Sequence, residues 1–341
     1  VRKMKPFIRN LLRMSVYQIK YMDAVPDSAV CNEAVKLAKR HKFAQLSGFV
    51  NGVLRNIARN IDSVQFDTLS IRYSMPQWIV DRFVAAYGEK KAEEIFKAFH
   101  NKSTISIRTN LTRCTPDELR ATLEAEGVTV TAVDELDYAF VISGFDYLNG
   151  LQSFRDGLFY VQDISSMLVA QTAAPKKGDY VIDVCAAPGG KSTHIAELLQ
   201  GSGHVLARDL TDNKVDMIEE NIERHGLNNM SAEVWDATVP DADSAGKADI
   251  LICDLPCSGL GVLGRKKDIR YKMTPESVDE LAALQRQILD TVHTYVKPNG
   301  VLVYSTCTID EAENEDNVRW FIEKHLEFEL DKNFAEGTGM K

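Results

Sequence analysis

Apolar residues recur at helical spacing through the first sixty residues of the chain. The pattern predicts helices over 6–22 and 29–40. A third helix is predicted where apolar residues follow the i, i+3, i+4, i+7 spacing of one buried face: Leu46, Phe49, Val50, Val53, Leu54 and Ile57. Arg55 and Arg59 occupy its other faces, where they either contact phosphate groups or lie in solvent. The region is therefore predicted to be all-helical.

Short alternating runs appear between helical ones after residue 60. The predicted helices are 77–86, 89–99 and 116–126, and the predicted strands are 105–110, 128–133 and 138–142. Thr115 is the expected N-cap of the third helix, with Pro116 at its first position. This order predicts a small α+β module. Arg108 and Asn110, on the first strand, either contact a phosphate or a base or face solvent.

Strands and helices alternate through the last half of the chain. The predicted strands are 180–185, 204–209, 232–235, 249–254, 301–306 and 327–330. The predicted helices are 167–172, 192–199, 212–224, 276–296 and 311–325, the first with Asp163 as a suitable N-cap. Such alternation predicts a Rossmann-like α/β fold with a mostly parallel sheet. Open sheets of this kind bind ligands at the carboxyl ends of their strands.

A glycine loop joins the first strand of that region to a helix, in the run Val181-Ile-Asp-Val-Cys-Ala-Ala-Pro-Gly-Gly-Lys-Ser192. Glycines allow close backbone approach to a ligand, and a helix start offers unpaired N–H groups. A phosphate-binding P-loop would need glycine at Cys185, and the dinucleotide fingerprint is also missing. These absences favour a smaller adenosine ligand, with S-adenosylmethionine as the first candidate.

Four aspartates end strands of this region. Asp209 follows Gly190 by nineteen positions, where an acid commonly binds ribose hydroxyls; a helix N-terminal charge is the alternative. Asp236 either meets the adenine edge or is a solvated loop acid. Together with Asp183 and Asp254, these side chains are expected to converge on one crevice.

Composition narrows the class of protein. Among 341 residues, 45% are hydrophobic and 26% charged, and no apolar run approaches the roughly 20 residues of a membrane span, so we expect a cytoplasmic protein without membrane contact. The net charge is −9, but residues 1–60 hold 12 Lys and Arg against 3 Asp and Glu, which leaves −18 for the rest. A basic first segment is typical of contact with phosphates.

Two of the six cysteines stand out, because Cys257 and Cys307 directly follow strands and lie where turn amides and Lys191 would lower a thiol pKa. Cys31, Cys114, Cys185 and Cys253 are expected to be buried and structural. No Cys-x-x-Cys pair occurs, so neither a metal site nor a disulfide framework is expected. The spacing does not decide which of the two thiols is the nucleophile.

Two resemblances emerge from these residues. The runs Leu11-Leu12-Arg13, Asn32-Glu33-Ala34-Val35 and Gly48-Phe49-Val50-Asn51-Gly52-Val53-Leu54-Arg55 resemble the later helices of a NusB-like RNA-binding domain. Three further motifs resemble the RNA cytosine-C5 methyltransferases of the NOL1/NOP2/Sun family: the glycine loop Asp183 to Lys191, Asp254-Leu-Pro-Cys-Ser-Gly259 and Ser305-Thr-Cys-Thr308. Leu255 and Lys267 depart from that family, which more often has alanine and proline there. Both ends are expected to be truncated relative to it.

The second resemblance implies a chemistry and assigns the thiols. A cysteine adds to C6 of cytosine and activates C5 for methylation by S-adenosylmethionine. The family's pattern gives this role to Cys307, assistance in proton removal or release to Cys257, and binding of the cytosine N3 and amine to Asp254. The expected cofactor-binding residues are Cys185, Ala186, Ala187, Pro188, Gly189, Gly190, Lys191, Asp209, Asp236 and Asp254.

The sequence as a whole predicts a three-part enzyme. The parts are a partial NusB-like domain at 1–60, an α+β module at 61–150 and a class I S-adenosylmethionine-dependent methyltransferase domain at 151–341. The expected product is 5-methylcytosine in 16S ribosomal RNA, the expected form a monomer. Transfer RNA is an alternative substrate. A non-catalytic RNA-binding or assembly factor is an alternative of another class, against which the two thiols argue.

Overall fold

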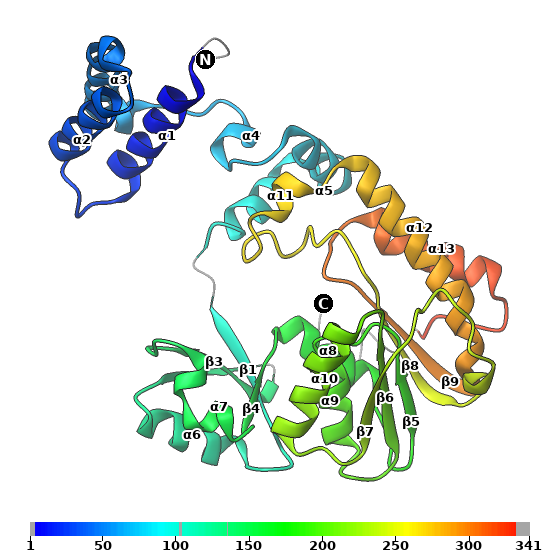
Figure 1. Cartoon of the computed structure of the whole chain (residues 1–341). Helices are drawn as coiled ribbons and strands as arrows, with labels where there is room; N and C mark the ends of the chain where they lie inside the picture. The colour runs from blue at the N-terminus through cyan, green and yellow to red at the C-terminus, as the bar shows by residue number, and fades with distance from the viewer. Residues whose placement is uncertain (1–3, 102–103, 135, 332–341) are drawn as a thin grey trace. The chain divides into compact units, whose positions relative to one another are not determined.

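The computed structural model describes residues 4–101, 104–134 and 136–331, and the chain divides between Arg72 and Tyr73 into two units (Figure 1). The first unit contains helices α1 (Pro6–Tyr21), α2 (Asp27–Arg40), α3 (Ser47–Asn60) and α4 (Leu69–Arg72), with short 3₁₀ turns at Ala44–Leu46 and Ile61–Ser63. Its apolar faces meet in one core: Ile8, Leu11, Leu12, Cys31, Ala34, Ala38, Val50 and Leu54. The three helices predicted here are confirmed.

The second unit begins with α5 (Gln77–Ala98), which is interrupted at Gly88. Gly88 has a φ of 75°, a conformation that glycine adopts without steric cost, so the segment forms two helical parts as predicted. Phe83 and Phe96, one from each part, stack with ring centroids 5.5 Å apart. Arg82 forms an ion pair with the buried Asp310, which ties the helix to the far end of the unit's sequence.

A four-stranded antiparallel sheet follows, in the order β2-β3-β1-β4. Its strands are β1 (Ile105–Thr109), β2 (Thr129–Val133), β3 (Leu136–Ser143) and β4 (Phe159–Val161). Helices α6 (Pro116–Ala125) and α7 (Gln152–Arg155) accompany it, with a 3₁₀ turn at Leu148–Gly150. Thr115 and Glu118 form a reciprocal capping box at the start of α6, as its sequence predicts. The three-residue β4 was not predicted, because it is too short to show alternation.

The larger sheet is entirely parallel, with the order β7-β6-β5-β8-β9. Its strands are β5 (Tyr180–Asp183), β6 (His204–Asp209), β7 (Met230–Val234), β8 (Ala248–Asp254) and β9 (Val296–Ser305). The helices of this region are α8 (Ile164–Ala173), α9 (Gly190–Leu198), α10 (Asp212–His225), α11 (Ile269–Lys272), α12 (Pro275–Val292) and α13 (Glu315–Lys324), with 3₁₀ turns at Ala242–Ser244, His293–Tyr295 and Glu311–Glu313. The predicted Rossmann-like architecture is confirmed.

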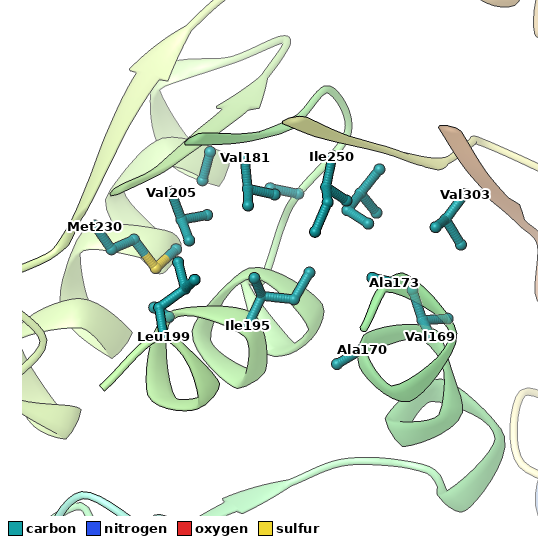
Figure 2. Packing of buried hydrophobic residues seen from close by; sticks show 14 of the residues in the cluster. Val169, Ala170, Ala173, Val181, Ile195, Leu199, Val205, Met230, Ile250 and Val303 are labelled. Carbon is teal, nitrogen blue, oxygen red and sulfur yellow. The ribbon is translucent and has the colours of Figure 1, made fainter. Parts of the chain in front are cut away.

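Each face of this sheet is covered by its own apolar layer. On one face, Val181, Val205 and Ile250 of the strands point toward Ile195 and Leu199 of the glycine-loop helix and its C-cap (Figure 2). The other layer packs the strands against α12 and α13, through residues such as Leu251, Ile288 and Phe321. Burial on both faces explains why the strands read as continuous apolar runs rather than alternating ones.

The predicted strand 327–330 is wrong. These residues form no strand, and instead the Phe328 ring packs against Phe321 with centroids 5.1 Å apart. Phe328 is therefore apolar because its side chain packs against α13, and not because it belongs to a strand. The predicted helix 276–296 also ends earlier, at Val292, because Val296 already pairs with Ala248 as the first residue of β9.

None of the helices in the described ranges is both long and apolar enough to cross a lipid bilayer.

We predict that Leu199→Ala lowers the free energy of unfolding by about 2–5 kcal/mol, because Leu199 is fully buried and the change leaves a cavity. Leu210→Ala is the matched control, since Leu210 is 57% exposed and its loss is expected to cost about 0.5 kcal/mol or less. Denaturant unfolding of the two variants measures the difference. Equal destabilisation would contradict the packing of this layer.

Candidate active site

The glycine loop lies between β5 and α9, at the carboxyl edge of the parallel sheet. Gly189 has a φ of 100° and forms the N-cap of α9. A Cβ atom on Gly190 would lie 3.0 Å from a ring carbon of Tyr160, so a side chain there would displace the tyrosine. Gly189 is therefore favoured by its left-handed backbone conformation, and Gly190 by the small space beside the Tyr160 ring. The Ala187–Pro188 peptide bond within the loop is cis.

Asp183 lies beneath this loop at the end of β5 and is almost fully buried. Its carboxylate accepts hydrogen bonds from the Ser192 hydroxyl and from the Cys185 N–H. Burial raises the pKa of Asp183 to about 7 in spite of these bonds. The side chain thus links the start of α9 to the end of the strand.

Asp209 occupies the corresponding position at the end of β6. Its carboxylate accepts hydrogen bonds from the Ala187 N–H at 2.9 Å and from Lys214 Nζ at 2.8 Å. It is thus hydrogen-bonded to the glycine loop. Asp236, two residues beyond β7, is exposed and accepts hydrogen bonds from the hydroxyl and N–H of Thr238.

A cavity of about 850 Å³ opens beside the loop. The predicted residues in its wall are Asp183, Ala186, Ala187, Pro188, Gly190, Lys191 and Asp254. Cys185, Gly189, Asp209 and Asp236 are not part of that wall. The wall also carries Arg265, Lys266 and Lys267, and Asp163, the expected N-cap of α8, forms an ion pair with Arg265. The wall therefore combines acidic and basic side chains.

Asp254 connects the cavity to the two thiols. One of its carboxylate oxygens pairs with Lys191 Nζ, and the other accepts a hydrogen bond from the Ser305 hydroxyl at 2.8 Å. Ser305 pairs with Asp254 across β8 and β9, so these neighbouring strands end together. Cys257 and Cys307 then follow the two strand ends.

The Cys257 and Cys307 sulfurs lie 3.2 Å apart, and the Cys307 N–H donates a hydrogen bond to the Cys257 sulfur. The Cys257 thiol stabilises a Cys307 thiolate by hydrogen bonding and lowers the pKa of Cys307 to about 7, assisted by Lys266 and Lys191 against burial and Asp254. The same contact, together with burial, raises the pKa of Cys257. Of the two thiols, Cys307 is therefore the one that ionises first.

Buried polar groups behind the thiols fix their loops. Glu313 is fully buried and accepts hydrogen bonds from the N–H of Ser258 and from Gln285 Nε2. The Gly261 N–H donates to the Cys307 carbonyl at 3.2 Å, and a side chain at Gly261 would collide with that oxygen. Sequence reasoning missed Glu313 and Ser305. No local signal singles out Glu313, because it lies within the acidic run 310–316.

Both interpretations of Arg108 and Asn110, as ligand-binding or solvent-facing residues, were wrong. Arg108 is 1% exposed and pairs with the equally buried Glu197 of α9 at 2.8 Å. Asn110 is fully buried and donates to the carbonyl oxygens of Gly157 and His225. These side chains join the small antiparallel sheet to the part of the chain that holds the larger parallel sheet, a role that strand alternation does not reveal.

This architecture, with a glycine loop after the first parallel strand and acids at the ends of the next strands, is that of the class I S-adenosylmethionine-dependent methyltransferases. The model of the 16S rRNA methyltransferase RsmB/F family matches residues 170–341. The NusB family matches 1–59, and the ferredoxin-like domain of RsmF/B-like methyltransferases matches 75–145. The chain belongs to the RsmB/F family of ribosomal RNA methyltransferases.

Individual relatives agree with this assignment. The probable ribosomal RNA small subunit methyltransferase B of Bacillus subtilis is 39% identical, over 96% of this chain and 75% of the relative. The ribosomal RNA small subunit methyltransferase B of Shewanella oneidensis is 32% identical, over 95% and 75%. Among solved structures, NSun6 from Pyrococcus horikoshii with SFG has a TM-score of 0.66 at 25% identity, covering 73% of this chain and 87% of that one.

We predict that alkylation of Cys307 by iodoacetamide rises with pH around a midpoint of about 7, because only the thiolate reacts and its fraction increases as pH passes the pKa. Cys257→Ala removes the stabilising hydrogen bond and shifts the midpoint upward. Cys114 is an internal control, since burial raises its pKa to about 11. Peptide mass spectrometry measures each rate. A Cys307 midpoint unchanged by Cys257→Ala would contradict the assigned cause.

Proposed function

We propose that the protein transfers a methyl group from S-adenosylmethionine to C5 of a cytosine in 16S ribosomal RNA, with Cys307 as the nucleophile. The observation that carries the proposal is the thiol pair, 3.2 Å between sulfurs, at the end of the strands that also place Asp254 in the cavity wall. A thiolate beside a carboxylate and a cofactor-sized cavity is what cytosine-C5 methylation requires, because C5 alone is too weak a nucleophile.

Several features of the cavity support S-adenosylmethionine as the ligand. The missing P-loop glycine at Cys185 disfavours a polyphosphate, and the Asp183 and Asp254 carboxyl groups in the cavity wall offer acceptors for an ammonium group. Gly190 allows close backbone approach at the start of α9. Ribose binding is assigned to Asp209 from its position at the end of β6, where it is hydrogen-bonded to the glycine loop although it lies outside the cavity wall. When bound, S-adenosylmethionine supplies an electrophilic methyl group.

The Cys307 thiolate starts the reaction by forming a bond to C6 of the cytosine ring. The electron pair of the C5–C6 double bond moves into the ring and makes C5 nucleophilic. After C5 has accepted the methyl group it carries both methyl and hydrogen. Removal of that hydrogen as a proton restores the double bond, and the electron pair of the S–C6 bond returns to Cys307 as the thiolate leaves.

Asp254 and Cys257 assist at opposite stages. We assign to Asp254 the binding of the cytosine amine, whose N–H donates to the carboxylate, and of N3 through a proton shared between them; that proton neutralises the negative charge that builds up in the ring during attack. Lys191 pairs with Asp254 in the structure and keeps the carboxylate in the cavity wall. Cys257 touches the nucleophilic sulfur and assists proton removal or release of the product.

Ribosomal RNA is proposed as the substrate on two grounds. The two relatives from Bacillus subtilis and Shewanella oneidensis are named as ribosomal RNA small subunit methyltransferases, and the chain covers three quarters of each. Residues 1–60 carry a net charge of +9, which suits contact with phosphates. A target cytosine must leave any base stack to reach Cys307, so a loop nucleotide is favoured.

We expect Cys307→Ala to abolish methyl transfer while S-adenosylmethionine still binds, because the nucleophile is lost and the cavity wall is untouched. Labelled methyl transfer into 16S ribosomal RNA, with transfer RNA as a parallel substrate, measures activity, and nucleoside mass spectrometry identifies 5-methylcytosine. Cys114→Ala is the matched control and should retain activity. Full activity of Cys307→Ala would refute the nucleophile; methylation of transfer RNA alone would refute the ribosomal substrate.

Cys257→Ala is expected to accumulate a covalent protein–RNA adduct, since Cys307 still attacks but release is slowed. The adduct appears as a slower band on a denaturing gel after incubation with RNA and S-adenosylmethionine. The double variant Cys257→Ala with Cys307→Ala should give no such band. Absence of the band in the single variant, with normal turnover, would remove Cys257 from the release step.

A further inference from the structure

We propose that Arg108, a residue of the small antiparallel sheet, is a positioning residue for the cofactor: it fixes the glycine loop in the shape that binds S-adenosylmethionine. This inference rests on the cofactor assignment in the proposed function. It assigns part of the cofactor site to a module that lies outside the methyltransferase fold.

Arg108 reaches the loop directly. Its Nη1 donates to the Gly190 carbonyl at 2.9 Å and also to the Gln162 side-chain oxygen. Its Nη2 donates to the Thr193 hydroxyl at 3.2 Å, one turn further along α9, and to Glu197 at 2.8 Å, two turns along. One rigid guanidinium therefore fixes three points of the helix that starts in the loop.

Tyr160, from β4 of the same small sheet, supports the loop from below. The Arg108 guanidinium lies over its ring, 5.4 Å from the centroid. The ring lies where a side chain on Gly190 would otherwise be, and its hydroxyl donates to the Pro188 carbonyl at 3.1 Å. The small sheet thus contacts the carbonyl oxygens at both Pro188 and Gly190. Pro188 and Gly190 are part of the cavity wall, so these hydrogen bonds fix the shape of the wall.

A purely structural role would explain the ion pair between Arg108 and Glu197 but not the bond to Gly190. Buried ion pairs contribute little net stability compared with apolar residues of similar size, whereas loss of one partner leaves a costly unpaired charge. What Arg108 adds is the fixed geometry of its hydrogen bond to the Gly190 carbonyl. Removing both charges together therefore separates the positioning role of Arg108 from its contribution to stability.

The experiment compares Arg108→Met with the double variant Arg108→Met, Glu197→Met. The single variant leaves Glu197 buried without its arginine and with only His225 Nδ1 nearby, 3.4 Å from Oε1, so both its melting temperature and its cofactor affinity should fall. The double variant should recover most of the melting temperature, yet its Kd for S-adenosylmethionine should remain about tenfold or more above wild type, as loss of a charged hydrogen bond to the loop predicts. Isothermal titration with S-adenosylmethionine and with S-adenosylhomocysteine measures this.

Two further variants complete the test. Arg120→Met is the matched control, because Arg120 belongs to the same module but lies over Phe140 in that module's own core, 5.1 Å from the ring centroid. It should bind the cofactor as wild type does. Arg108→Lys keeps the charge but lacks the planar fork, so it should restore the melting temperature better than the affinity.

In steady-state assays the double variant should show a raised KM for S-adenosylmethionine with the KM for RNA unchanged. Wild-type cofactor affinity in a folded double variant would overturn the positioning role, and so would an equal loss in Arg120→Met. Failure of the wild-type protein to bind S-adenosylmethionine would instead overturn the proposed function itself. The two failures are thus distinguishable.

Discussion

The candidate site depends on one constraint: the five strands of the larger sheet all run in the same direction. Asp183, Asp209 and Asp254 are far apart in sequence, but each ends a strand of the same sheet, so their backbones reach a common edge. The glycine loop follows β5, Cys257 follows β8 and Cys307 follows β9, so all three lie at this edge. Apolar layers on both faces hold the strands in register, which transmits their alignment to the side chains just beyond them.

At that edge, side chains of the same type differ in their properties because their surroundings differ. Burial raises the pKa of Asp183 to about 7, whereas Asp254 lies in an ion pair with Lys191 at the cavity wall. The two thiols differ in the same way, because a single contact lowers the pKa of Cys307 and raises that of Cys257. Residue type alone thus does not assign roles; the neighbours of each group do.

The sequence predicted those parts of the structure that depend on local pattern. Strands of the larger sheet, the capped helix after Thr115 and the break near Gly88 all carry short-range signals, and the structure contains them. Strand 327–330 failed because alternation cannot distinguish a strand from a segment whose Phe328 packs against a helix. The interpretations of Arg108 were wrong for a different reason. Its partner Glu197 is 89 residues away, and only the tertiary fold shows that two charged residues are buried together.

The pairing of β8 with β9 has a consequence for how the protein is made. Asp254 and Ser305 are hydrogen-bonded neighbours separated by 51 positions, with α11 and α12 between them. A chain emerging from the ribosome can close the glycine loop against β5, β6 and β8 well before β9 exists, but Cys257 has no sulfur partner until β9 has docked. Under the proposed function, the cofactor site and the pair of thiols therefore form at different times during synthesis.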